Sequence, residues 1–287
     1  MKVQIGYDAH RLENIIFPGK IEVELVKICL VKDQRPFFSI IIPTLNEELF
    51  LPRLLEDLIK QSFRDFEVIV IDGQSTDRTI KEAKRFNSKL PLLKIFQSPK
   101  RGLACQRNFG GGKAAGKYLL FFDADGKVDP SFLKKLNKTL VKKPYGIFSA
   151  WMKPDSNKLV DNILVSIANL ITLFTTLIKK PRFCGAFTGC SQQAFIGAKG
   201  FNETIVMNED YDFSCRCAQL GFKCKFYLIP KSYFSFRRFR REGYLAPIAK
   251  YTWAGLLFTF KGTNYHFGLE YKMGGTNYKQ NKQGWKK

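Results

Sequence analysis

Two aspartates separated by one residue, Asp123 and Asp125, follow the short apolar run YLLFF at residues 118–122. A run of this length, rich in aromatic residues and bounded by turn residues, is typical of a strand buried on both faces of a sheet. The carboxylates then lie at the carboxyl end of that strand, where open α/β sheets bind their ligands. Because two like charges so close together repel, we expect a hard divalent cation to neutralise them and to hold phosphate oxygens.

An ordinary turn or a calcium loop would also place two aspartates this close together. Standing alone, the stretch fits a turn with solvated carboxylates. A calcium loop counted from Asp123 would need Gly at its sixth position and Glu at its twelfth, but the chain has Val128 and Lys134 there. The choice between a turn and a cation site therefore depends on the remaining polar residues at this sheet edge.

Polar side chains also follow the apolar runs at residues 39–43 and 67–71. Pro43 cannot donate to a sheet ladder and is expected to end the pairing of the first run. The side chains that follow it can grip a base or a ribose at the sheet edge; they are Thr44, Asn46 and Glu47. Asp72 ends the second run, where a carboxylate accepts from a base N–H or a ribose hydroxyl. Taken singly, each is equally well explained as a loop cap.

These positions need a particular set of elements to bring them together. From about residue 37 to 227, short β-rich runs alternate with helix-like segments, which is typical of β-α units and a mainly parallel sheet. The predicted strands are 39–43, 67–71, 92–97, 118–122 and 146–151. Helices are expected over 47–61, where apolar residues recur at helical spacing, and from a cap at 75–77 to about residue 86.

The whole arrangement resembles glycosyltransferase family 2, whose catalytic domain has the GT-A fold of nucleotide-diphospho-sugar transferases. Four motifs carry the resemblance, in order PTLNE at 43–47, DGQSTD at 72–77, RGLACQRNFG at 101–110 and DAD at 123–125. The resemblance runs from about residue 37 to 235. It implies an α/β fold with a mainly parallel central sheet flanked by helices.

The resemblance also implies roles that spacing alone does not give. In the family, the turn after the first strand and the aspartate ending the second strand bind the nucleoside. At these positions the chain has Pro43, Thr44, Glu47 and Asp72. The D-x-D carboxylates hold Mn²⁺ or Mg²⁺ against the donor diphosphate, which assigns the metal to Asp125 and, directly or through water, to Asp123. The predicted donor site also includes Asn46, Gln74 and Arg107.

A second acidic cluster, NEDYDFSCRCAQLGF at 208–222, looks like the family's acidic motif below the acceptor site. The match places the general base on Asp210, with Glu209 beside it. Such a base takes the proton of the acceptor hydroxyl as the anomeric carbon is attacked opposite the leaving group, which inverts the anomeric centre. The alternative is an acidic helix N-terminus that only interacts with the helix dipole. Residues 183–195 resemble the glycine-bearing loop that shapes the acceptor pocket.

The chain departs from the family pattern in two places. Many members have two adjacent aspartates after the second strand, whereas here Gly73 and Gln74 follow Asp72, which leaves nucleoside selectivity open. The Q-x-x-R-W element of processive polysaccharide synthases is absent, which favours transfer of a single sugar. In SFRRFRRE, Arg237 or Arg238 is expected to neutralise the donor diphosphate.

The net charge of the chain favours anionic partners. With 47 basic and 25 acidic residues among 287, it carries +22, which attracts nucleic acid, anionic membranes or phosphorylated substrates. The nearly apolar segment at 159–178 fits an amphipathic helix lying against the core or in a membrane interface. A C-terminal amphipathic helix at 244–260 follows four arginines, as in an interfacial anchor, although packing on the core explains it equally well.

The predicted organisation has three parts. Residues 1–36 form an N-terminal extension of unknown role that contains IGYDAHRL, residues 37–235 the catalytic domain, and residues 236–287 a basic, aromatic membrane-interface or packing extension. The seven cysteines form no regular framework, so free thiols and a reducing compartment are expected. We therefore expect a protein peripheral on the cytoplasmic face of the membrane.

The sequence thus predicts an inverting, metal-dependent glycosyltransferase acting in cell envelope glycan synthesis. It would move one sugar from a UDP- or GDP-sugar to a lipid-linked or membrane-proximal glycan acceptor, with no nucleic-acid partner. One alternative is a sugar nucleotidyltransferase, which would want a Gly-rich, Arg-bearing loop where this chain has PTLNEE. The second is a basic nucleic-acid-binding protein, for which no motif is evident.

Overall fold

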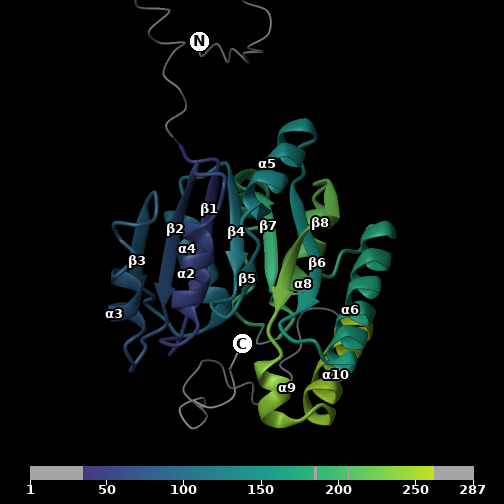
Figure 1. Ribbon diagram of the computed structural model, residues 1–287. Helices are drawn as coiled ribbons and strands as arrows, with labels where there is room; N and C mark the ends of the chain where they lie inside the picture. The colour runs from purple at the N-terminus through teal and green to yellow at the C-terminus, as the bar shows by residue number, and fades with distance from the viewer. Residues whose placement is uncertain (1–34, 184–185, 206, 262–287) are drawn as a thin grey trace, which may run out of the picture. The chain divides into compact units, whose positions relative to one another are not determined.

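An eight-stranded sheet forms the centre of the protein in the computed structural model, which describes residues 35–183, 186–205 and 207–261 (Figure 1). Its order is β3-β2-β1-β4-β7-β6-β8-β5. The strands are β1 (Phe38–Thr44), β2 (Phe66–Asp72), β3 (Leu93–Gln97), β4 (Tyr118–Phe122), β5 (Lys127–Val128), β6 (Ile147–Pro154), β7 (Phe187–Ser191) and β8 (Cys224–Phe234). The described residues from Pro36 onward belong to one compact unit, residues 36–287. The predicted N-terminal extension, with its IGYDAHRL stretch, lies almost wholly in residues 1–34, outside the described part.

The two halves of the sheet differ in strand direction. Strands β3, β2, β1 and β4 run parallel to one another. In the other half, β7 is antiparallel to both β4 and β6, β8 is parallel to β6, and β5 is antiparallel to β8. The predicted α/β class and the five predicted strands are confirmed. The antiparallel strands of the second half were not predicted.

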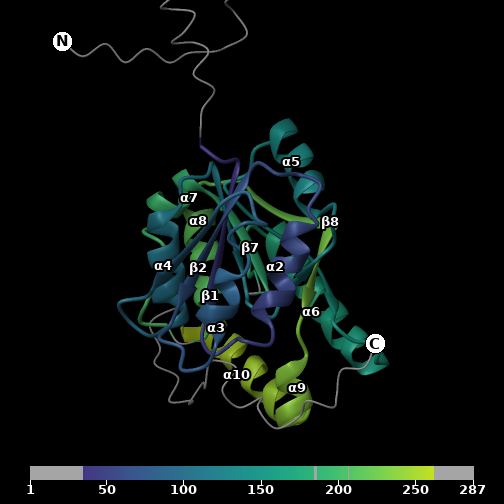
Figure 2. The same ribbon diagram turned by 60° about the vertical axis from the view of Figure 1, so that its left-hand side comes forward.

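Helices cover both faces of the sheet, as Figure 2 shows. They are α2 (Leu51–Ile59), α3 (Thr79–Lys84), α4 (Leu103–Lys113), α5 (Phe132–Lys142), α6 (Leu159–Leu177), α7 (Gln192–Gly197), α8 (Glu209–Gln219), α9 (Arg237–Glu242) and α10 (Leu245–Lys261). In β1, Ile40 belongs to a buried apolar cluster with residues of α2, α3 and α5, whereas its neighbour Ile41 belongs to a second cluster with residues of α4, α7 and α8. Alternate residues of a strand thus serve two cores, which explains why the central strands are apolar throughout.

Three local predictions were wrong. The helix predicted to start at residue 47 starts at Leu51, after a turn over residues 48–50. Pro43 does not end β1 but lies opposite Ile71 of β2. Proline has no N–H to donate to the β1–β4 ladder, but no such bond is lost, because β1 pairs with β4 only as far as Ile41. The segment interpreted as a loop, residues 183–195, contains strand β7 and the start of α7.

Helix α6 turns its polar side inward and its apolar side outward. Asn169 is fully buried, where its amide both donates to and accepts from the backbone of Met152 in β6. Large apolar side chains instead face outward, and Phe174 is 63% exposed. By length and composition this helix could cross a membrane, and only 28% of its apolar window is buried, unlike the mostly buried core helix of a soluble protein.

The C-terminal helices pack on the same part of the protein as α6 (Figure 1). Phe236 and Phe239, at and within α9, form a buried cluster with Val165 of α6 and Met152 of β6. The Tyr244 hydroxyl, just before α10, donates to the buried carboxylate of Asp161 at 2.7 Å. The predicted boundary at residue 236 therefore falls between elements that are tied together by direct contacts.

Helix α4 approaches the sheet most closely at Gly110. A Cβ at this position would lie 2.5 Å from a methyl group of Ile41 and 2.9 Å from a side-chain carbon of Ile71. Overpacking of a filled core costs about 1–3 kcal/mol. We therefore expect Gly110→Val to lower the free energy of unfolding by about that amount, measured by urea denaturation.

A control is available two residues later in the same helix. A Cβ at Gly112 would meet nothing within 4 Å. Gly112→Ala should leave the free energy of unfolding unchanged or raise it by up to about 1 kcal/mol, because Ala is the better helix former. Equal losses for both variants would show that close packing is not the reason for glycine at residue 110.

Candidate active site

A cavity of about 590 Å³ opens at the carboxyl edge of β1 and β4. Its wall contains five carboxylates from three different parts of the chain, namely Glu47, Asp123, Asp125, Glu209 and Asp210. Each was singled out in the sequence, and the fold brings all five together. Buried carboxylates are costly unless cations compensate them, so the arginines of the cavity decide what the site can do.

Arg107 joins two of these carboxylates from the buried side. It comes from α4, and its side chain is only 2% exposed. One terminal nitrogen donates to Glu209 at 2.7 Å and the other to Asp123 at 3.1 Å. Its guanidinium also lies 5.2 Å from the ring centre of Phe201. Arg107 therefore positions Asp123, at the end of β4, relative to the start of α8; its predicted contact with the donor stays a prediction.

Arg237 joins two other carboxylates of the cavity, those of Glu47 and Asp125. Both of its terminal nitrogens donate to Glu47 at 2.6 Å, in a bidentate pair. Its Nε lies 2.7 Å from Asp125, and its guanidinium is 4.8 Å from the ring centre of Phe50. The sequence predicted a cation here for the diphosphate, and the structure shows that α9 carries it into the cavity. Arg238 also lines the cavity.

The pKa values of the carboxylates reflect their crowding. Burial raises the pKa of Glu47 to about 7, against the opposing effect of Arg237. Burial likewise raises the pKa of Asp123 to about 6; Arg107 opposes this, whereas Asp125 and Glu209 add to it. The Asp123 side chain is 38% exposed, and it lines the cavity. A cation bound here would offset the cost of burying the charged carboxylates and would reduce the repulsion between them.

The donor set suits the predicted metal. Within the described ranges, no three His, Cys, Asp or Glu side chains are grouped to hold a metal by themselves. Mg²⁺ and Mn²⁺ are commonly held by one or two carboxylates, with phosphate and water completing their shells. The pair of Asp123 and Asp125 fits that pattern. The five cysteines among the described residues are all free, as predicted.

Asp210 lies in the cavity wall at the first turn of α8. It is 7% exposed, and its carboxylate accepts from the backbone N–H of Tyr211 at 2.9 Å. Burial raises its pKa well above the usual range, and the neighbouring Glu209 raises it further, against the effect of Arg107. A carboxylate with a raised pKa that faces a cavity can accept a proton from a bound hydroxyl.

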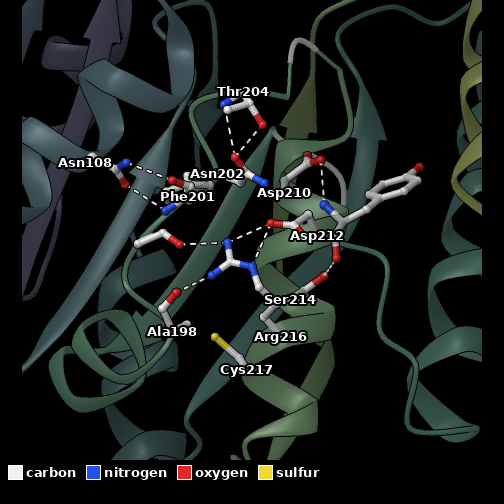
Figure 3. Close-up of polar contacts among 12 residues, drawn as sticks. Asn108, Ala198, Phe201, Asn202, Thr204, Asp210, Asp212, Ser214, Arg216 and Cys217 are labelled. Carbon is white, nitrogen blue, oxygen red and sulfur yellow. Dashed lines mark hydrogen bonds and ion pairs between the residues drawn. The ribbon is translucent and has the colours of Figure 1, made fainter. Parts of the chain in front are cut away.

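Helix α8 is held rigidly behind Asp210. Figure 3 shows Asp212 turned toward Arg216 and away from Asp210. Asp212 and Arg216 form an ion pair at 2.7 Å. Arg216 also donates to the carbonyl groups of Ala198 and Gly200. On the other side of the helix, the Ser214 hydroxyl donates to the Pro181 carbonyl at 2.8 Å. Of the acidic residues in this turn, Asp212 is therefore structural and Asp210 is available for chemistry.

The predicted nucleoside residues fall into two groups. Pro43, Thr44 and Glu47 line the cavity. Asn46, Asp72 and Gln74 are not among its lining residues. Asp72 instead accepts from the backbone N–H groups of Gln74 and Ser75, at 3.1 and 3.0 Å, while Asn46 accepts from Thr76.

One carboxylate oxygen of Asp72 is nevertheless not used in these hydrogen bonds. Its Oδ1 is buried and has no hydrogen-bond partner among the described residues. A base N–H would satisfy that oxygen. The role of Asp72 in nucleoside binding, and those of Asn46 and Gln74, stay predictions.

The sequence interpretation missed several residues of the cavity. Gln106 cross-links the ends of β1 and β2, because its amide donates to the carbonyl groups of Thr44 and Ile71, both at 2.8 Å. Its position one residue before Arg107 in RGLACQRNFG was the available signal. The apolar part of the wall, from α6 and α10, gave no such signal, because only the fold places these helices beside the carboxylates.

The sequence of this chain is similar to those of known glycosyltransferases. Residues 39–201, more than half of the chain, match the family described as Glycosyl transferase family 2. Poly(ribitol-phosphate) beta-N-acetylglucosaminyltransferase TarS of Staphylococcus aureus is 36% identical over 100 residues, which are 34% of this chain and 18% of TarS. The cholesterol galactosyltransferase of Borreliella burgdorferi is 32% identical over 98 residues, 34% of this chain and 27% of that protein.

A solved structure extends the comparison to the fold. The crystal structure of S. aureus TarS 1–349 in complex with UDP superimposes with a TM-score of 0.58 and 25% identity, covering 69% of this chain and 60% of that one. The predicted GT-A fold is thereby confirmed. The matched segment spans only about a fifth to a quarter of the two curated relatives in length. By its sequence match and its fold, this chain belongs to glycosyl transferase family 2.

Proposed function

We propose that this protein is an inverting glycosyltransferase that moves a single sugar from a UDP- or GDP-sugar to a lipid-linked or membrane-proximal acceptor in cell envelope synthesis. The observation that carries the proposal is the shared cavity, whose wall contains Asp123, Asp125 and Asp210 together. Membership of the family and the UDP complex of the similar TarS structure support a nucleotide-sugar donor.

The donor half of the cavity suits a nucleoside diphosphate. Thr44 and Glu47, which the resemblance assigns to the nucleoside, line the same cavity as Asp123 and Asp125, which would hold Mn²⁺ or Mg²⁺ against the diphosphate. When bound, such a metal supplies Lewis-acid stabilisation of the charge on the leaving diphosphate. Arg237 and Arg238 provide guanidinium groups in the same wall, which can bind phosphate oxygens directly.

Asp210 would act on the acceptor. In its deprotonated form it takes the proton of the acceptor hydroxyl, while that oxygen forms a bond to the anomeric carbon and the nucleoside diphosphate departs from the opposite face. Glu209, held by Arg107 at 2.7 Å, fixes the first turn of α8 and keeps negative charge beside Asp210. That charge raises the pKa of Asp210 and makes it a better proton acceptor.

The outward apolar face of α6 supports an acceptor at a membrane. Exposed apolar patches of this kind mark interaction surfaces, and α10 also exposes two aromatic side chains, Trp253 and Phe260. With +22 net charge, the protein would be attracted to anionic lipid. We therefore place it on the cytoplasmic face as a peripheral protein. The cholesterol galactosyltransferase among its relatives is named for a lipid acceptor.

A panel of UDP- and GDP-sugars, with and without Mn²⁺, tests the proposed activity by the nucleoside diphosphate released. We expect one donor to be consumed in a metal-dependent reaction. Asp210→Asn should lower kcat by about 10²–10⁴, because the base is lost, while the affinity for UDP stays within a few fold. Wild-type activity should rise with pH until the raised pKa of Asp210 is passed, since only the carboxylate accepts a proton.

An aspartate outside the cavity provides the control. Asp65 is exposed and does not line the cavity, so Asp65→Asn should retain wild-type kcat and pH dependence. Release of nucleoside diphosphate from no donor in the panel would contradict the proposed activity. Near-normal turnover of Asp210→Asn would remove this residue from the role of base.

Membrane binding is tested with vesicles that contain phosphatidylserine. Leu170 is exposed on α6, and Leu170→Glu should weaken co-sedimentation at least about tenfold, because burial of a carboxylate in the interface is unfavourable. Val141→Glu, an equivalent change at an exposed position of α5, should bind like wild type. Binding should also weaken in high salt. Unchanged binding of Leu170→Glu would exclude α6 from the membrane contact.

A further inference from the structure

The cavity extends beyond the catalytic carboxylates into an apolar groove. Besides Asp210, the cavity is lined by residues of two helices that are far apart in the sequence, α6 and α10. Helix α6 contributes Leu164, Ile167, Ala168 and Ile171, and helix α10 contributes Ile248, Tyr251, Gly255 and Leu256. We call this part the chain groove. Its wall carries no carboxylate from either helix among the lining residues.

The groove is continuous with the place where the acceptor must react. Tyr211, next to Asp210, packs edge-on against Phe258 of α10 with ring centres 5.9 Å apart. Arg182 lies on the same ring at 5.4 Å and donates to the Thr259 hydroxyl at 2.8 Å. Asp210 and the groove residues of α6 and α10 line one cavity, so a molecule that presents a group to Asp210 can extend along α10. Most side chains that α6 and α10 contribute to the groove are apolar, apart from three threonines, so we expect the extending part to be apolar as well.

The arginines of this region indicate the charge of the occupant. Arg107 and Arg237 are engaged with the carboxylates of the cavity. Arg182, Arg238 and Arg241 also line the cavity; Arg241 pairs with Glu242 outside the lining. The Nε of Arg182 is buried and has no hydrogen-bond partner within the described residues. Guanidinium groups at the head of an apolar groove favour an anionic headgroup, phosphate above all.

We propose that the chain groove binds the hydrocarbon chain of an amphiphilic acceptor whose headgroup is anionic, with Arg182 beside that headgroup. The inference rests on the proposed function only for the identity of the bound molecule as the acceptor. The groove lies between the two helices that also carry the exposed apolar patch. A chain can therefore pass from a bilayer into the groove without crossing water.

Gly255 gives a sharp test of the groove. It lies on α10 in the groove wall, and a Cβ there would meet nothing within 4 Å. Gly255→Leu should therefore fill the groove without a clash, and loss of a helical glycine should not lower the thermal midpoint. Gly112→Leu is the matched control, because Gly112 is also helical, has equally open surroundings and lies outside the cavity.

The probe is dodecyl phosphate below its critical micelle concentration, titrated calorimetrically into the full-length protein. We expect saturable binding by wild type and Gly112→Leu, and at least tenfold weaker binding by Gly255→Leu. Ile171→Asn, a change on the opposite wall at a half-exposed side chain, should weaken it as well. Inorganic phosphate should compete poorly and dodecyl maltoside should bind at least tenfold more weakly than dodecyl phosphate.

Each result bears on the groove separately from the sugar transfer. Equal binding by Gly255→Leu and wild type, or full competition by inorganic phosphate, would overturn the chain groove even if a nucleotide sugar is consumed. Equal binding of the maltoside would overturn the anionic headgroup. Conversely, groove-dependent binding in a protein that consumes no donor of the panel would uphold the groove and refute the proposed transfer.

Discussion

Pairing of buried carboxylates with two arginines holds the site together. Arg107 ties Asp123 to Glu209, and Arg237 ties Asp125 to Glu47. Removing one partner of a buried pair leaves an uncompensated charge, which costs about 3–5 kcal/mol. These four contacts join the loop after β1, the loop after β4 and the helices α4, α8 and α9. The D-x-D turn is common to both arginines, so the donor site and the catalytic helix share one electrostatic unit.

The second arginine also links the donor half of the cavity to its apolar half. Arg237 belongs to α9, and α10 follows after only two residues. Whatever fixes Arg237 in the donor site therefore fixes the start of α10, which forms one wall of the chain groove. Phe239 and Tyr244 secure the same segment against β6 and α6. The C-terminal helices are in this way part of the candidate active site, although they lie beyond the family match at residues 39–201.

Sequence reasoning worked where a polar residue ends an apolar run. Asp123 and Asp72 were placed correctly at strand ends because a buried strand has to be apolar and its end does not. It failed where tertiary contacts decide the outcome. The direction in which α6 faces could not be predicted, because hydrophobic periodicity does not show whether Asn169 meets water or the backbone of Met152. Pro43 stayed within β1 because β4 pairs with that strand only up to Ile41, a fact of register that the sequence does not contain.

The central claim is that Asp123 and Asp125 hold the cation that carries the donor diphosphate. Its most direct test is the binding of Mn²⁺ in the presence of UDP, followed by the loss of the free Mn²⁺ signal in electron paramagnetic resonance, for wild type and Asp125→Asn. The wild-type protein should take up Mn²⁺ in proportion to bound UDP, and the variant should need at least about tenfold more metal, because half of the protein's donor set is altered. Equal uptake of Mn²⁺ by the two proteins would show that the cation is held elsewhere.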